Sequence, residues 1–227
     1  MTPDARAAMR AAIAAAIGRG TFPDAVADHP GAFSWSPLAA GDRAARFRAE
    51  LEALGGTCHD MPEPNADAVV ALLDRLMAGR GPRRVLMWDE ALLPVAGLPT
   101  ALVRAGISID TVTPGDMDSI ERREELASAT IGLTGADAAL AETGSIVLAS
   151  GPGRARLASL LPPIHVALVE RHRLVDSLAA LIRVRPDLAT AGANVVCITG
   201  PSRTADIEHT LSRGVHGPGE VHVVFVG

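Results

Sequence analysis

The chain has 227 residues, of which 48% are hydrophobic and 21% are charged, so it is long enough for one globular domain and too apolar to be a disordered tail. Its net charge of −5 argues against a nucleic-acid duplex as partner, because phosphate contacts require a clustered surplus of cations. All 21 basic residues are arginine. Without lysine there is no amine for a Schiff base and no P-loop ammonium group, so both kinds of site are excluded.

Cysteine and histidine usage limits the metal chemistry. Cys58 and Cys197 form no CxxC pair, so this chain does not by itself supply the thiolates of an iron–sulfur cluster or a cysteine-based zinc site. The histidines show no HExxH-like spacing, and we expect no bound metal. Cys197 lies in the apolar run Val195-Val196-Cys197-Ile198, which predicts a buried thiol, although one disulfide is compatible with the sequence.

The hydropathy pattern indicates a soluble protein. Residues 11–17 are apolar, but they are mostly alanine and follow Asp4, unlike the strongly apolar core of a secretory signal. No other run approaches the ~20 apolar residues that a membrane helix requires. We therefore expect a cytoplasmic protein without a membrane partner.

The first 56 residues predict a helical extension. Residues 4–18 and 39–54 have helical patterns, and glycines end both. Residues 21–37, between them, are rich in proline and predict an irregular segment that packs on the protein. We therefore divide the chain into an N-terminal helical extension, residues 1–56, and an α/β domain, residues 57–227.

From residue 57 onward, strand and helix patterns alternate. Strands are predicted at 57–61, 84–88, 108–112 and 129–133, with helices between them at 66–78, 94–105 and 116–126. Later strands are predicted at 145–149, 164–169, 195–199 and 221–226. The runs 146–148, 195–198 and 223–226 are continuously apolar, which predicts central strands buried on both faces. The alternation implies right-handed crossovers and a three-layer α/β/α fold with a largely parallel sheet.

The first candidate site follows the strand at 129–133, at the strand end where open α/β sheets bind ligands. Thr134 and Gly135 form a turn that leads into a predicted very short helix with Asp137 and Glu142. A continuous helix would aim these two carboxylates about 140° apart, so they share a crevice only if it unwinds before Glu142. Either both handle protons, or Asp137 caps the helix and Glu142 is its solvated end.

The second candidate site begins where the strand at 195–199 runs into a Gly-Pro turn and a predicted helix start. Exposed backbone N–H groups and polar side chains there would bind an anion. The groups expected to hold it are Gly200, Ser202, Arg203 and Thr204. Asp206 and Glu208 would repel a dianion, so a monoanionic carboxylate fits better than a phosphate. The alternative is plain helix capping, with Arg203 paired to Asp206.

Two loops supply the remaining candidates. His216 lies in the glycine- and proline-rich turn 214–220 and is predicted either to act as an acid–base group or to bond a backbone carbonyl. Arg154 and Arg156 directly follow a predicted strand. They are predicted either to clamp a carboxylate bidentately or to be solvated surface residues.

Four stretches are distinctive together and in this order. They are GLTGAD…ETGS from residue 132, SLLPPIH from residue 159, ITGPSRTADIE from residue 198 and GVHGP from residue 214. With them the sequence resembles the LutC/YkgG family, the LUD-domain proteins of lactate utilization. The resemblance covers roughly residues 60–227, whereas the N-terminal part matches only in being helical.

The resemblance implies a fold similar to the NagB/RpiA/CoA-transferase-like group. Within that group, Gly135-Ala136-Asp137 is similar to the aspartate motif of sugar-phosphate isomerases. Glu142-Thr143-Gly144 matches the Glu-Asn-Gly of some CoA transferases only in part, because Thr143 replaces the asparagine. Family members without a cysteine-rich extension, like this chain, work beside separate iron–sulfur proteins that take part in oxidising L-lactate to pyruvate.

These expectations combine into a subunit of an L-lactate-oxidising system that binds a small organic acid or related anion. The resemblance places iron–sulfur clusters on partner proteins and no cofactor on this chain. The candidate catalytic residues are Asp137, Glu142 and His216. The candidate anion-binding residues are Thr134, Gly135, Arg154, Arg156, Gly200, Ser202, Arg203 and Thr204. Two alternatives stay open: a stand-alone isomerase or transferase acting on a phosphorylated or thioester metabolite, and a non-catalytic assembly subunit.

Overall fold

The computed structural model describes residues 5, 7–12, 15, 40–113, 115–116, 118–189, 192, 194–205, 211–214 and 216–227. The chain divides into two compact units, residues 1–36 and 37–227. The described residues of the first unit are helical, in agreement with the helix predicted at 4–18. The irregular segment predicted at 21–37 lies outside the described residues.

A six-stranded parallel sheet forms the centre of the second unit. Its strands are β1 (Thr57–Met61), β2 (Arg84–Met87), β3 (Ser108–Asp110), β4 (Ile131–Gly135), β7 (Ile164–Glu170) and β12 (Glu220–Val226), in the spatial order β1-β12-β7-β4-β2-β3. Three of the four inner strands, β4, β7 and β12, are buried along nearly their whole length. The predicted α/β class with a largely parallel sheet is confirmed.

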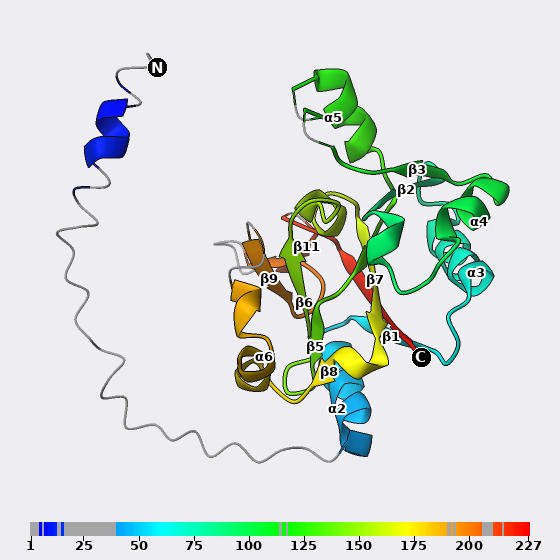
Figure 1. Cartoon of the computed structure of the whole chain (residues 1–227). Coiled ribbons are helices and arrows are strands. Elements are labelled where there is room, and N and C mark those ends of the chain that lie inside the picture. The colour runs from blue at the N-terminus through cyan, green and yellow to red at the C-terminus, as the bar shows by residue number, and fades with distance from the viewer. Residues whose placement is uncertain are drawn as a thin grey trace. The chain divides into compact units, whose positions relative to one another are not determined.

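Helices pack around this sheet. The described α-helices of the second unit are α2 (Ala40–Ala53), α3 (Ala66–Met77), α4 (Leu98–Arg104), α5 (Ile120–Ala127) and α6 (Leu178–Val184), and short 3₁₀ helices are η1 (Glu90–Leu92), η2 (Arg156–Ser159), η3 (Arg171–Arg173) and η4 (Pro186–Ala189). Figure 1 shows α3 and α4 together on one side of the sheet. Asn65 caps α3 by accepting the Ala68 N–H at 3.0 Å, and Ser119 and Ser177 cap α5 and α6 in the same way.

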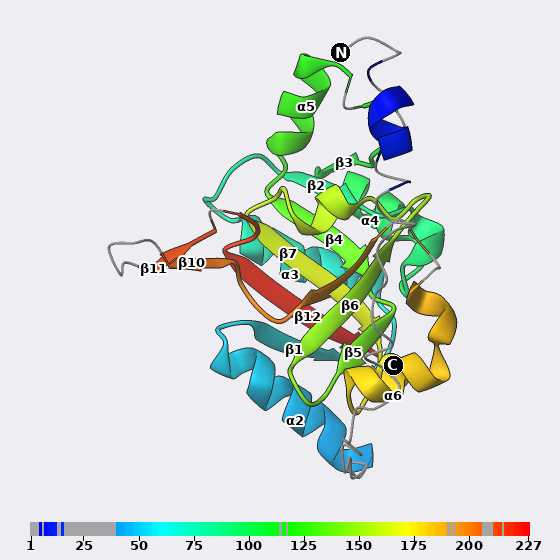
Figure 2. The ribbon, with the colours of Figure 1, turned by 90° about the vertical axis from the view of Figure 1, so that its left-hand side faces the viewer.

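A second, smaller sheet covers the other side. Its strands are β8 (Leu174–Val175), β5 (Ala138–Leu140), β6 (Ser145–Ser150) and β9 (Asn194–Ile198), in that spatial order. Figure 2 shows β5 and β6 crossing in front of β7 and β12. Alternate side chains of β6 face two different cores. Ile146 and Leu148 pack toward the six-stranded sheet, whereas Val147 and Ala149 pack with Leu181 of α6.

Local predictions around the two candidate sites are wrong. Residues 138–140 are not helical but form β5, antiparallel to β6. The chain after Ser202 does not start a helix: it forms β10 (Arg203–Ala205), which pairs antiparallel with β11 (Leu211–Arg213). β9 is the terminal strand of its sheet and is not buried on both faces. Cys197 on β9 is consequently exposed rather than buried.

The helix α2 packs into the second unit. Its Phe47 and Leu51 are fully buried, and the Phe47 ring meets the Phe225 ring of β12 edge to face, with 5.0 Å between centroids. Gly144, whose φ is +65°, brings the β5–β6 turn against α2, because a Cβ there would lie 2.4 Å from the Leu51 nitrogen. The helix predicted at 39–54 is confirmed, whereas the domain boundary at residue 56 stays a prediction.

Two findings concern membranes and metals. Across the described ranges, no helix combines the length and apolar character needed to cross a membrane. Among the same residues, no three His, Cys, Asp or Glu side chains are grouped so that they could hold a metal ion. The expectation that this chain binds no metal or cofactor of its own stays a prediction.

Candidate functional site

The path of the chain through the six-stranded sheet reverses between β2 and β4. After β2 the chain moves outward to β3 at one edge, whereas after β4 it moves the other way, to β7 and then β12. The connections that leave the carboxyl ends of β2 and β4 therefore diverge. Open α/β sheets bind ligands in the crevice at such a switch point.

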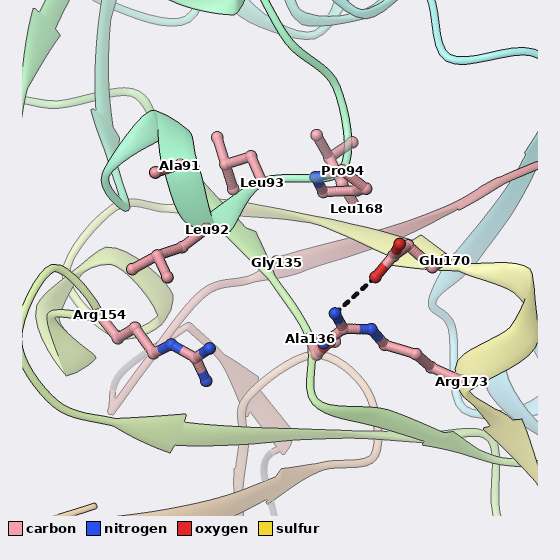
Figure 3. A pocket seen from close by; sticks show the side chains of 10 residues that line it. All are labelled: Ala91, Leu92, Leu93, Pro94, Gly135, Ala136, Arg154, Leu168, Glu170 and Arg173. Atoms are coloured by element: carbon pink, nitrogen blue, oxygen red, sulfur yellow. Dashed lines mark hydrogen bonds and ion pairs between the residues drawn. The ribbon is translucent and has the colours of Figure 1, made fainter.

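A cavity of about 210 Å³ lies at this crevice, and we call it the switch-point cavity. Its lining comes from the segment after β2, the end of β4, the loop after β6, and the end of β7 with η3: Ala91, Leu92, Leu93, Pro94, Gly135, Ala136, Arg154, Leu168, Glu170 and Arg173. Figure 3 shows Arg154 and Arg173 entering from opposite sides. The cavity thus presents two guanidinium groups from different parts of the chain.

Arg154 is held in place by a buried carboxylate. Asp137 Oδ1 accepts from Arg154 Nη1 at 2.7 Å, and its Oδ2 accepts from the Ala149 backbone N–H at 2.7 Å. Asp137 is only 7% exposed. The Arg154 guanidinium also lies over the Trp88 ring, 5.5 Å from its centroid. Among the described residues, these contacts fix one edge of the guanidinium and leave its other N–H groups available to a ligand.

Arg173 fixes the same turn from the opposite side. Its Nη1 donates to the Ala136 carbonyl at 2.9 Å, and its Nη2 pairs with Glu170 Oε2 at 2.5 Å. Ala136 directly precedes Asp137, so the two arginines form hydrogen bonds with adjacent residues of the β4–β5 turn. Each arginine of the cavity is balanced by one carboxylate.

Close backbone approach accounts for two glycines at the cavity. A Cβ on Gly135 would lie 2.8 Å from the Leu92 carbonyl oxygen. Gly153 has a φ of +69°, and a Cβ there would lie 2.4 Å from Asp89 Oδ2. Its carbonyl also accepts the Asp89 N–H at 3.0 Å. Glycine at both positions lets β4 and the β6 loop approach the segment after β2.

Thr134 and His165 form a buried pair behind the cavity. Thr134 Oγ1 and His165 Nε2 are 2.9 Å apart, and both residues are fully buried. Burial lowers the pKa of His165 to about 3, so its imidazole is neutral at pH 7. Thr134, a predicted anion-binding residue, therefore lies in the sheet interior and not in the cavity lining.

Glu142, the second predicted acid, does not join Asp137. The two residues flank β5, whose extended backbone rises about 3.3 Å per residue. Asp137 is buried and its N–H donates to the Val147 carbonyl at 2.8 Å. Glu142 is exposed, and its N–H donates to the Asp176 carbonyl at 2.9 Å. The structure does not place the two carboxylates in one crevice.

The other predicted residues lie around the turn after β9. A second cavity, also of about 210 Å³, brings together four of them: Arg156, Gly200, Ser202 and His216. Arg203 lines a neighbouring cavity and donates through Nη2 to the Leu54 carbonyl. Thr204 lies in β10. The predicted residues are therefore divided between separate cavities and do not converge on one centre.

Glu170 and Arg173 line the switch-point cavity but are not among the residues predicted from the sequence. Both follow the apolar run predicted as the strand at 164–169, at its carboxyl end. The signal that could have revealed them is the charged run Glu170-Arg171-His172-Arg173 directly after that strand, at the edge where such sheets bind ligands.

Comparisons with known proteins agree with this architecture. The family model described as the LUD domain matches residues 44–226. "Lactate utilization protein C" of Halalkalibacterium halodurans is 33% identical over 163 residues, which cover 70% of this chain and 69% of that protein. "Lactate utilization protein C" of Shouchella clausii is 32% identical over 162 residues, with coverage of 70% and 69%.

A solved structure has the same fold. The crystal structure of a DUF162 family protein from Deinococcus radiodurans superposes with a TM-score of 0.58 at 22% identity, covering 84% of this chain and 100% of that chain. This similarity concerns the fold alone. The family model spans most of the chain, and two relatives match it at about one identical residue in three. The chain therefore belongs to the LUD domain family, as its motifs predict.

Proposed function

We propose that this protein is a subunit of a system that oxidises L-lactate to pyruvate together with separate iron–sulfur proteins, and that its switch-point cavity binds the carboxylate of a small organic acid. The relatives called lactate utilization protein C support the role in lactate use. The observation that supports a carboxylate as the ligand is the pair of arginines, Arg154 and Arg173, on opposite sides of one small cavity.

A monocarboxylate fits the charges of this cavity. Arg154 and Arg173 are each paired with one carboxylate, from Asp137 and Glu170. A guanidinium has more N–H groups than one carboxylate occupies, so the remaining donors are able to hold a ligand carboxylate. The four charged groups sum to zero before binding, which suits a monoanion better than a phosphate dianion. A volume of about 210 Å³ suits a small molecule.

Asp137 is a positioning residue in this proposal. Both of its oxygens accept hydrogen bonds, and the side chain is buried, so the carboxylate orients Arg154. The proton-transfer role predicted for Asp137 from the sequence is not part of this proposal. Oxidation of lactate to pyruvate releases two protons, which go to the solvent, and two electrons, which the iron–sulfur proteins would accept.

Lactate-dependent reduction of a dye tests the proposal. The purified chain is assayed with and without the iron–sulfur proteins, and we expect reduction only when both are present. Arg154→Gln should lower kcat/KM for lactate at least tenfold, because it removes a charge-assisted contact. Arg46→Gln is the matched control, since Arg46 is an exposed residue of α2 that pairs with Glu50.

Three outcomes would change the assignment. Lactate oxidation at the full rate by the purified chain alone would contradict the subunit role. Unchanged oxidation with Arg154→Gln would favour a non-catalytic assembly subunit. Turnover of a phosphorylated or thioester metabolite by the chain alone would favour the isomerase or transferase.

A further inference from the structure

A second cavity lies apart from the switch-point cavity, between β9, η2 and the start of β12. We call it the hydroxyl cavity. Part of its wall is apolar, formed by Leu160, Val196 and Val221. The polar part of the wall comes from the Thr-Gly-Pro-Ser turn after β9, from η2 and from the 214–220 turn, and includes Thr199, Ser202, Arg156 and His216. Among the described residues, none lines both this cavity and the switch-point cavity.

A chain of hydroxyl groups ends at the hydroxyl cavity. Ser145 Oγ donates to Thr199 Oγ1 at 2.9 Å, and Thr143 Oγ1 lies 2.7 Å from Ser145 Oγ. A hydroxyl group has one proton, so Thr143 must be the donor of the second bond. Thr199, at the end of the chain, accepts from Ser145 and keeps its own proton for another acceptor. Successive hydrogen bonds polarise one another, which strengthens Thr199 as a donor at the cavity wall.

Arg156 adds a positive charge to the same wall. Ala155, with φ −64° and ψ 125°, lies between the two arginines of this segment, and Arg156 begins the 3₁₀ helix η2. Trp88 Nε1 donates to the Ala155 carbonyl at 3.2 Å and pins this arrangement. Arg154 lines the switch-point cavity, whereas Arg156 lines the hydroxyl cavity. Unlike Arg154, Arg156 forms no ion pair with any carboxylate in the described part of the chain.

We infer that the hydroxyl cavity is a second binding site, for a small monocarboxylic acid with an apolar tail. Thr199 and Arg156 hold the carboxylate oxygens, and Leu160 and Val196 cover the tail. A single arginine matches one negative charge, and the apolar wall disfavours a phosphate, which has no apolar part to bury. The inference goes beyond the proposed function, because it gives each chain two carboxylate sites.

Calorimetric titration of the full chain with butyrate, a monocarboxylate with an apolar tail and no hydroxyl group, tests this site. Thr199→Val and Arg156→Gln should each raise the Kd for butyrate at least tenfold. Thr199→Ser keeps the hydroxyl group and should retain binding within about threefold. Arg154→Gln should leave butyrate binding at this site unchanged. Thermal unfolding of each variant shows whether it is folded, and Arg156 is an exposed residue whose replacement should not disturb the fold.

The outcomes separate this inference from the proposed function. Butyrate binding that is lost in Arg154→Gln but intact in Thr199→Val and Arg156→Gln would overturn the second site and leave the switch-point proposal standing. If Arg154→Gln leaves the affinity for lactate unchanged but Thr199→Val lowers it, the second site is supported and the first is contradicted. Inorganic phosphate that binds more tightly than butyrate and depends on Thr199 would overturn the ligand class. Absence of butyrate binding to the folded wild-type chain would overturn the site.

Discussion

At the scale of single residues, two buried polar side chains near the carboxyl end of β4, Asp137 and His165, affect the stability of the fold. Both oxygens of Asp137 accept hydrogen bonds. His165 uses Nε2 with Thr134, whereas its Nδ1 is buried without a hydrogen-bond partner in the described part of the chain. Removal of Asp137 therefore leaves its partners unsatisfied, while His165 makes stability depend on pH.

Asp137→Ala should destabilise the fold as well as misplace Arg154. The substitution leaves the buried Ala149 N–H without an acceptor and Arg154 without its partner, which should cost about 2–4 kcal/mol of unfolding free energy. Asp74→Ala removes an exposed ion pair with Arg83 and should cost less than about 1 kcal/mol. Urea unfolding measures both. Equal costs would show that the Asp137 network does not stabilise the fold.

His165 should make the protein less stable below neutral pH. Its pKa is about 3 in the folded chain, against the ordinary histidine value of 6.5 in the unfolded chain, so the unfolded chain binds the extra proton between these pH values. The contribution of His165 to the unfolding free energy is complete above pH 6.5 and decreases as the pH falls toward 3. At pH 5 this residue should account for a loss of about 2 kcal/mol. Burial also lowers the pKa of His59 and His222, and these act in the same direction.

Urea unfolding at pH 7 and pH 5 checks this dependence. His165→Gln does not titrate and keeps an amide for Thr134, so its loss of stability between the two pH values should be smaller by about 2 kcal/mol. His172→Gln, at an exposed position, should behave like the wild type. The account of His165 is wrong if His165→Gln loses as much stability between pH 7 and pH 5 as the wild type does.

At the scale of helices and strands, the buried strands were easier to predict from the sequence than the segments that connect them. Continuous apolar runs such as 164–169 and 221–226 predict buried strands, and both are confirmed. The β5 segment Ala138–Leu140 consists of alanine and leucine, which favour helix, but it is held as a strand by β6 on one side and β8 on the other. Propensity predicted the wrong structure there because the pairing partners lie elsewhere in the sequence.

The prediction for the segment after β9 was wrong for a similar reason. Hydroxyl residues after a Gly-Pro turn are typical of a helix start, and the sequence predicts one there. The hairpin partner of β10 is β11, and neither segment carries an alternating apolar pattern that would reveal the pairing. The motif therefore predicted a place of interest but not its local structure.

Gly132→Ala should disrupt the packing of η2 on the sheet. A Cβ at Gly132 would lie 1.6 Å from the Ala158 carbonyl oxygen, so either β4 or η2 must move. We expect a loss of about 3 kcal/mol or more in unfolding free energy, measured with urea. Gly151→Ala is the control, because nothing lies within 4 Å of its Cβ position. An equally stable Gly132→Ala protein would contradict this packing.

At the scale of the whole molecule, motif order predicted the family, and the pattern of strands predicted the fold class. The arrangement of the candidate residues in space was not predictable, because it depends on how the strands of the smaller sheet pair. Asp137 and Arg154 come together only through the antiparallel pairing of β5 with β6. Arg154 and Arg156 line different cavities although only one residue lies between them, and η2 begins at Arg156.

A crystal structure of the chain with L-lactate tests the central claim most directly. We predict lactate in the switch-point cavity, with its carboxylate between Arg154 and Arg173 and with the Asp137–Arg154 pair intact. The account would be contradicted by a switch-point cavity that holds only water at a lactate concentration that saturates binding in solution.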